Sequence, residues 1–372
     1  MARLLSRSAL LPVIFPILFP IGLTLLIVSS PISAAEVSSE WPKIFPAERQ
    51  PERILEVFGA TDHDEFRPLV RAFQRRYPNV ELHYYEQNTR AMYYNFLDRQ
   101  QTPPDVVISS AMDLQVKLVN DGHAQPFQSP ETRLLPNWAK WRSEIFGFTY
   151  EPAVIVINNN FLPSPQALDS RSDLLDLLRS QRETLSGKVG VFDIRRVGIG
   201  YLLWAHDMAQ SGISSRILEL MSRTNARVFP SSRSMLKAIA DDQLHIAYNV
   251  MGSYARTWAA RHPNIRIVLP RDYTSVIMRS AFIPRYAENI DDARRFVRFL
   301  LSQDGQQTIA QKTGLYPLKT DLPDLPDDKN LRVSSVSPLR PLAFGLPLLI
   351  YTDTMKRQQI LEEWDLLMKE FE

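Results

Sequence analysis

Cysteine is absent from the 372-residue chain. Its absence excludes disulfide bonds, thiolate metal sites and lipid attachment at a cysteine behind a signal peptide. An excess of charge of one sign is also lacking, because 43 Lys and Arg residues face 41 Asp and Glu residues, a net charge of +2. This balance predicts no nucleic-acid partner. The hydrophobic and charged fractions, 45% and 23%, are typical of a globular chain of one large or two ordinary domains.

Motifs of common catalytic sites are lacking too. The six histidines form no H-x₃-H or H-E-x-x-H spacing. The chain has neither a G-x-S-x-G nucleophile motif nor the glycine-lysine motif of a P-loop. Asp62, His63 and a serine could in principle form a triad, but these residue types occur together by chance in most chains. We therefore predict no enzymatic activity and no cofactor.

Only one apolar stretch is long enough to cross a bilayer. It runs from Ala9 to about Val28, follows two arginines and is interrupted by three prolines. Ser33-Ala34-Ala35 comes next, a small-residue pattern typical of signal-peptide cleavage. The stretch predicts a signal peptide over 1–35, cleaved before Glu36, and a periplasmic location, which suits an exported protein without cysteine. Its length also fits the alternative of an uncleaved membrane anchor.

A buried strand that runs through hydroxyl residues into a helix recurs along the chain. The clearest case is Val106–Ile108, an apolar run typical of a strand covered on both faces. Ser109-Ser110-Ala111 follows, and then an amphipathic helix. Free N–H groups and the positive end of the helix dipole would meet there, which suits an anion. Ser109 or Ser110 could equally serve only to cap the helix.

Alternating strand and helix patterns predict two α/β regions with mainly parallel sheets. In the first region we expect strands over 54–58, 80–84 and 106–108, separated by helices over 65–76 and 90–99. In the second we expect strands over 189–192 and 245–249, helices over 172–182, 201–210 and 235–241, and two more strands between 265 and 283. The long apolar run over 148–157 could cross between the two regions.

Several stretches resemble one protein family. Tyr150–Asn158 resembles an interlobe strand, Asp193–Tyr201 a loop that opens a ligand-facing helix, and Asp292–Gln306 with Thr313–Pro317 a pair of packing helices. Over about residues 53–320 the chain is similar to the type II periplasmic solute-binding proteins of ABC importers, in the branch that binds ferric ion or organophosphates. Ser109–Gly122 resembles a narrower subgroup of iron-type components and of phosphoglycerate-sensing systems.

The resemblance implies an α/β fold of two lobes, a Venus flytrap, in which each lobe is a mixed, mainly parallel sheet flanked by helices and two strands cross between lobes. After a linker over 36–51, lobe 1 is expected over 52–147 and 275–320. Lobe 2 is expected over 148–274 and 321–372, with a C-terminal helix. The implied function is capture of a small anionic solute, an organophosphate or a carboxylate, between the lobes. The monomer would then present it to the membrane permease of an ABC importer.

Four strand-to-helix junctions are expected to meet in the cleft between the lobes. Their hydroxyls, glycine N–H groups and single arginine suit a phosphate or carboxylate, because charge-assisted hydrogen bonds orient such groups. The predicted ligand-binding residues are Thr61, Asp62, Ser109, Ser110, Ala111, Arg196, Gly200, Tyr201, Tyr248, Asn249 and Ser253.

Two alternatives share this fold. A ferric-ion carrier would use Tyr248, Tyr254, His63 and Asp62, although iron-binding relatives use adjacent tyrosines and these two are six positions apart. A ligand sensor would present the closed form to the ectodomain of a sensor kinase. In the preferred interpretation no metal is bound. The tail over 321–372 carries no functional prediction.

Overall fold

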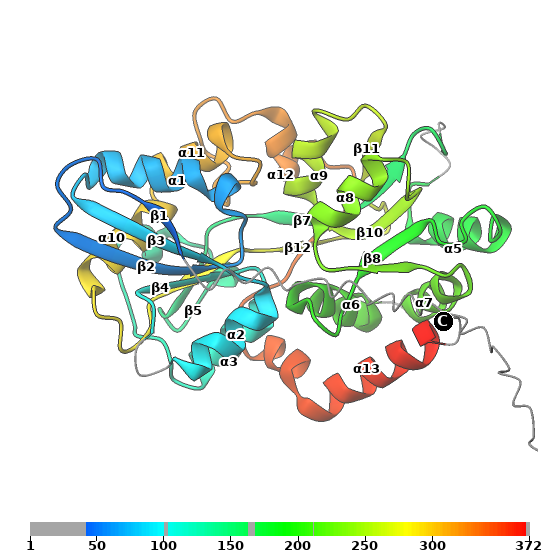
Figure 1. Ribbon diagram of the computed structural model, residues 1–372, viewed down its shortest axis with the longest axis horizontal. Helices are drawn as coiled ribbons and strands as arrows, with labels where there is room; N and C mark the ends of the chain where they lie inside the picture. Colours follow the sequence, from blue (N-terminus) through cyan, green and yellow to red (C-terminus); the bar gives the residue numbers. More distant parts are fainter. Residues whose placement is uncertain (1–41, 100–102, 163–167, 211, 370–372) are drawn as a thin grey trace, which may run out of the picture. The chain divides into compact units, whose positions relative to one another are not determined.

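Two mixed β-sheets, each flanked by helices, form two lobes (Figure 1). We call the first sheet with its helices lobe 1 and the second sheet with its helices lobe 2. The computed structural model describes residues 42–99, 103–162, 168–210 and 212–369. The predicted signal peptide lies outside these residues. The architecture is the two-lobed α/β fold predicted from the sequence.

The sheet of lobe 1 is built from apolar runs early in the chain. Its strand order is β1-β3-β2-β4-β13-β6-β5, with β2 parallel to β3 and β4 and the other pairs antiparallel. β4 is buried along its whole length, as its apolar sequence predicts. The strands are β1 Lys43–Phe45, β2 Arg53–Gly59, β3 Val80–Glu86, β4 Val106–Ser109, β5 Lys140–Trp141, β6 Ile145–Gly147 and β13 Ser280–Phe282. Part of the expected linker thus forms the edge strand β1.

The sheet of lobe 2 is organised around β7, whose eight residues are all buried. Its strand order is β14-β12-β7-β10-β8-β9, and β11 also pairs with β7. The strands are β7 Glu151–Asn158, β8 Val189–Phe192, β9 Arg227–Phe229, β10 Ile246–Met251, β11 Ile265–Val268, β12 Thr274–Ile277 and β14 Leu339–Pro341. The region from 265 to 283 holds three strands and not the two expected, because the chain leaves lobe 2 after β12 and enters lobe 1 at β13.

Helices cover both sheets. Those of lobe 1 are α1 His63–Arg76, α2 Thr89–Asp98, α3 Met112–Asn120, α4 Pro130–Leu134, η1 Asn137–Ala139, α10 Ile290–Leu301 and α11 Gln303–Lys312. Those of lobe 2 are α5 Arg171–Ser180, α6 Gly198–Gln210, α7 Ile213–Arg223, α8 Ser232–Ala240 and α9 Gly252–Ala259. α1 illustrates the sequence logic, with acidic residues in its first turn, arginines in its last and a buried apolar face. None of the described helices is long and apolar enough to span a membrane.

Two of the segments that carry the chain between the lobes lie side by side. The first leads from β6 into β7, and the second leads from β12 into β13. Glu151 at the start of β7 is the antiparallel partner of Ile277 at the end of β12. Residues just beyond these two positions are therefore neighbours in space although they are distant in sequence.

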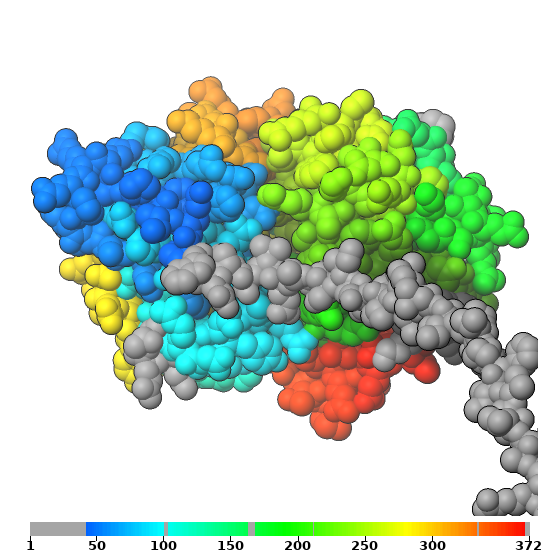
Figure 2. Space-filling view, viewed as in Figure 1, coloured from blue at the N-terminus to red at the C-terminus, as the bar shows by residue number. Residues whose placement is uncertain are grey.

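The C-terminal segment, residues 339–369, touches both lobes. β14 pairs with β12 in lobe 2, η4 packs against α3 in lobe 1, and α13 packs against α7 in lobe 2. In the space-filling view this segment (red) lies beside α2 and α3 (cyan) (Figure 2). The elements after α11 are η3 Asp327–Lys329, α12 Leu331–Ser334, η4 Leu346–Thr352 and α13 Thr354–Lys369. The tail is thus a further connection between the lobes.

Candidate functional site

Thr61 is held at the carboxyl end of β2 by a buried tyrosine. The Tyr84 hydroxyl donates to the Thr61 carbonyl oxygen at 2.7 Å and accepts from the Thr61 N–H at 3.2 Å. Gly59 makes room for this ring, because a Cβ there would lie 2.0 Å from the tyrosine oxygen. The Thr61 hydroxyl is buried and has no hydrogen-bond partner among the described residues. This strand end therefore presents a fixed and unused hydroxyl.

Asp62 makes contacts between the lobes. Its carboxylate accepts a hydrogen bond from Arg233 of α8 at 2.7 Å, and its N–H donates to the Tyr254 hydroxyl of α9 at 3.4 Å. His63 instead stays within lobe 1, where its Nδ1 lies 2.8 Å from a Glu86 carboxylate oxygen. The junction after β2 therefore joins lobe 1 to two helices of lobe 2.

Ser109, Ser110 and Ala111, at the carboxyl end of β4, have different roles. The Ser109 hydroxyl accepts from the Ala111 N–H at 3.2 Å and so closes the turn before α3. Ala111 is the N-cap of α3 and no side chain caps it, so the expectation that a serine caps this helix is wrong. Ser110 and Ala111 are buried. A Cβ at Gly198 of α6 would lie 3.4 Å from the Ala111 side chain, so the first turns of α3 and α6 face each other across the lobes. Of the three residues, only Ser110 keeps a hydroxyl without a described hydrogen bond to the chain.

The junction before α6 lies mostly within lobe 2. Arg196 has a side chain that is 61% exposed, and its nearest carboxylate is Asp193 at 3.9 Å. A Cβ at Gly200 would lie 2.4 Å from Phe192, so this glycine permits close packing inside the lobe. Tyr201 is buried with the Arg357 guanidinium 4.0 Å from its ring centre, and burial raises its pKa to about 12.

Tyr248 and Asn249 belong to a buried network in lobe 2. The Tyr248 hydroxyl and the Asn249 amide both donate to Asp207 at 2.8 Å. Arg171 donates to the Tyr248 hydroxyl at 2.8 Å and to Asp207 at 3.2 Å, and Tyr273 donates to Asp207 at 2.9 Å. Sequence reasoning missed Asp207 and Arg171. A single carboxylate inside the apolar α6 was the available sign of such a network.

Arg279 and Glu151 lie where the two crossing segments run side by side, and sequence reasoning missed both. Arg279 is 2% exposed, and its Nε and Nη2 have no hydrogen-bond partner in the described parts of the chain. Its Nε lies 3.6 Å from Glu151, and its guanidinium carbon lies 5.7 Å from the Tyr254 ring centre. Tyr84, which holds Thr61, and Asp62 also act electrostatically on Arg279, and Ser253 acts on Glu151. The hydroxyls of Thr61 and Ser253 are buried without a hydrogen-bond partner among these residues. Unused donors and acceptors from both lobes thus gather around one buried cation.

The residues of the alternative ferric-ion site lie in different parts of the structure and contact different partners. Tyr248 is part of the Asp207 network, whereas Tyr254 contacts Asp62 and His63 contacts Glu86. Burial raises the pKa of both tyrosines above the ordinary value, which disfavours the tyrosinate that would bind Fe³⁺. Among the described residues no group of three or more histidine or acidic side chains could hold a metal ion.

Asp113 is a buried acid in the first turn of α3. Neither of its oxygens has a hydrogen-bond partner within the described chain. Burial raises its pKa to about 7, and nearby N–H groups and Arg357 offset this only in part. The folded protein therefore keeps a proton here that the unfolded chain loses near pH 4, so stability falls as pH rises from about 4 to about 7.

Asp113→Asn should remove this loss of stability. We expect the variant to gain about 1–3 kcal/mol over the parent at pH 8, less than the full shift implies, because the charged carboxylate can draw Arg357 or water towards it. Thermal unfolding at pH 5, 6, 7 and 8 measures the difference. The stability difference between the variant and the parent should increase with pH up to about pH 7 and then stay constant. A difference that does not change with pH would contradict this assignment.

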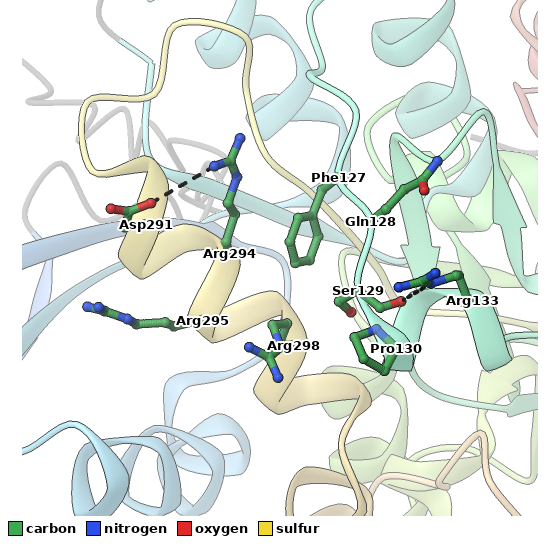
Figure 3. Close-up of a pocket in the computed structure, with 9 residues that line it drawn as sticks. All are labelled: Phe127, Gln128, Ser129, Pro130, Arg133, Asp291, Arg294, Arg295 and Arg298. Carbon is green, nitrogen blue, oxygen red and sulfur yellow. Dashed lines mark hydrogen bonds and ion pairs between the residues drawn. The ribbon is translucent and has the colours of Figure 1, made fainter.

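A surface pocket lies in lobe 1, away from the two crossing segments, between α10 and the loop that leads into α4. Its volume is about 440 Å³. Four of its nine lining residues are arginines (Figure 3). Acidic side chains partly neutralise these arginines, since Arg298 donates to Glu131 at 3.2 Å and Arg295 donates to Asp292 at 2.7 Å. The lining residues are Phe127, Gln128, Ser129, Pro130, Arg133, Asp291, Arg294, Arg295 and Arg298. None of the predicted ligand-binding residues lines this pocket.

A sequence model of the family described as bacterial extracellular solute-binding protein matches residues 55–315. The chain belongs to this family. The match covers both lobes and includes Thr61, Glu151, Ser253 and Arg279. Because the family is one of solute-binding proteins and not of enzymes, the prediction of no catalytic activity is confirmed. The comparison with curated protein sequences gives no match.

Solved structures support the fold of this solute-binding protein. The substrate binding protein of the ABC transporter from Agrobacterium tumefaciens is 29% identical, with a TM-score of 0.83, over 91% of this chain and 100% of that chain. Iron-bound HitA from Pseudomonas aeruginosa is 15% identical, with a TM-score of 0.67, over 84% of this chain and 99% of that one. AfuA from Actinobacillus pleuropneumoniae, with fructose-6-phosphate bound, is 16% identical, with a TM-score of 0.67, over 86% of this chain and 99% of that chain. The last two show the fold alone.

Proposed function

We propose that this protein binds a small organic anion, a phosphate ester or a carboxylate, between its lobes in the periplasm and delivers it to the permease of an ABC importer. The observation that carries the proposal is the Arg279 guanidinium, buried at the crossing segments with two nitrogens that lack a hydrogen-bond partner among the described residues. A buried cation with unused donors suits an anion, because charge-assisted hydrogen bonds are roughly twice as strong as neutral ones.

Hydroxyls from both lobes complete the proposed site. Thr61 and Ser110 would contribute from lobe 1, and Ser253, in the first turn of α9, would contribute from lobe 2. The positive ends of α3 and α9 add to the preference for an anion. Tyr248 and Asn249 would hold the wall of lobe 2 through Asp207. Arg196 remains a competing candidate for the arginine ligand, with its guanidinium largely exposed in this structure.

Delivery to an importer is supported by the similarity to the substrate binding protein of an Agrobacterium tumefaciens ABC transporter. The predicted signal peptide fits the same role. Structural neighbours are described as bound to iron or to fructose-6-phosphate, so the shared fold holds both kinds of ligand. The pairing of a buried arginine with unused hydroxyls favours the organic anion over Fe³⁺ here.

A thermal-shift screen tests the proposal. The protein starting at Glu36 would be heated with fructose-6-phosphate, 3-phosphoglycerate, citrate, ferric citrate or neutral glucose. Ligand at 100 times its Kd stabilises the folded state by about 2.7 kcal/mol, a shift of several degrees. We expect a shift with at least one phosphate ester or carboxylate. A shift only with ferric citrate, together with a visible tyrosinate-to-iron band, or only with glucose, would overturn the proposal.

A further inference from the structure

Glu151 is a buried acid beside the proposed anion site, and its carboxylate oxygens lack hydrogen bonds among the described residues. It is 0% exposed, and neither carboxylate oxygen has a hydrogen-bond partner of normal geometry among the described residues. Burial raises its pKa, and the nearby Arg279 charge and Ser253 hydroxyl lower it. A carboxylate has room for about four hydrogen bonds, and a buried one left without them is costly. Besides the Ser253 hydroxyl and the Arg279 guanidinium nearby, this acceptor therefore has room for a further donor.

Other charged groups near Glu151 are engaged elsewhere. The Lys329 ammonium donates to the carbonyl oxygens of Ile309, at 3.0 Å, and of Thr313. The Glu65 carboxylate accepts from the Gly314 N–H. Arg279 is the remaining cation, and its Nε lies 3.6 Å from Glu151, beyond a normal hydrogen bond. The two groups thus form a buried ion pair that leaves donors of Arg279 and acceptors of Glu151 without hydrogen bonds among the described residues.

We infer that the solute carries a hydroxyl or ammonium group next to its anionic group, and that Glu151 selects for this donor. This inference rests on the proposed function. An anion without such a donor would meet Arg279 but would also face the Glu151 carboxylate, which repels it. A hydroxylated or aminated anion satisfies both side chains at once. Sites that hydrogen-bond a polar group of the substrate reject the analogue that lacks it far more strongly than apolar pockets discriminate by size.

The ligand class is therefore a hydroxylated or aminated organic anion, such as a polyol phosphate, a hydroxy acid or an amino acid. Inorganic phosphate and simple fatty acids fall outside this class. Glu151 would be a specificity-determining residue at the end of the first crossing segment, beside the hydroxyl of Ser253. With a purely structural ion pair between Glu151 and Arg279, any such preference would remain unchanged in Glu151→Gln, so the two roles give different results.

Isothermal titration with matched pairs of solutes tests the inference. The pairs are glycerol 3-phosphate with propyl phosphate, lactate with propionate, and alanine with propionate. We expect the parent protein to prefer the hydroxylated or aminated member of at least one pair by about tenfold or more. In Glu151→Gln this ratio should fall at least about fivefold, because the repulsion of the simple anion disappears and the charged acceptor is lost.

Glu65→Gln is the matched control, since it removes a neighbouring carboxylate that already accepts from the backbone. It should leave the ratio unchanged. Equal binding of both members by the parent protein would overturn the role of Glu151 but not the proposed function. An unchanged ratio in a folded Glu151→Gln would do the same. Failure of every anion to bind would overturn the proposed function and this inference together. If the variant does not fold, equal binding of both members by the parent protein would still overturn the role of Glu151.

Discussion

Arg279→Met is expected to weaken binding of the anion found in the thermal-shift screen by about 100- to 1,000-fold. The variant removes two unused nitrogens, and each charge-assisted hydrogen bond contributes about 1.5–3 kcal/mol. Glu151 loses its neighbouring cation in this variant, but a buried carboxyl can take up a proton. The fold should therefore survive. Isothermal titration measures the affinity, and thermal unfolding without solute checks the fold.

Two further variants sharpen this test. Arg279→Lys keeps a charge beside Glu151 but loses the planar fork, so we expect an intermediate loss of about tenfold. Arg196→Ala removes the exposed arginine that the sequence analysis placed in the site, and its effect should stay within about twofold. Tight binding by both Arg279 variants, with a large loss in Arg196→Ala, would move the site to the junction before α6.

Asp207→Ala should destabilise the protein by about 3–5 kcal/mol. Asp207 is 1% exposed and accepts hydrogen bonds from Arg171, Tyr248, Asn249 and Tyr273. Its removal leaves the Arg171 guanidinium buried, with Asp272 at 3.0 Å as its remaining carboxylate. Urea unfolding followed by circular dichroism measures the change.

Asp176→Ala is a suitable control for Asp207→Ala, because this aspartate forms an exposed ion pair with Arg179. It should change the stability by no more than about 0.5 kcal/mol. A loss below about 1 kcal/mol in Asp207→Ala would show that water or Asp272 replaces the missing acceptor.

The fold could be predicted because its signals are local. Short apolar runs such as Val106–Ile108 become buried strands, and the amphipathic pattern after Asp62 becomes α1. The site could be predicted only in part. The hydroxyls of Thr61 and Ser253 follow strand ends, a position that the sequence itself reveals, whereas the proximity of Glu151 to Arg279 depends on the pairing of β7 with β12.

The sequence nevertheless contains features that could have indicated Arg279 and Asp207. Arg279 is the only charged residue between Tyr273 and Pro284, and Asp207 is the only carboxylate in the apolar helix α6. Such residues are rarely buried unless they have partners or a function. Tyr248 and Tyr254 show the opposite problem. They are close in sequence, but the chain turns into α9 at Gly252, so one ring lies in the Asp207 network and the other beside Arg279.

The packing of η4 against α3 offers a way to make the protein report its own ligand. η4 continues into elements of lobe 2 but rests on lobe 1, so relative motion of the lobes would alter its surroundings. Leu346 and Ile350 of η4 are 63% and 52% exposed. Because the chain has no cysteine, one introduced at either position could be labelled with an environment-sensitive dye without side reactions. The labelled protein would be a fluorescent sensor whose reporter lies outside the residues proposed to hold the solute.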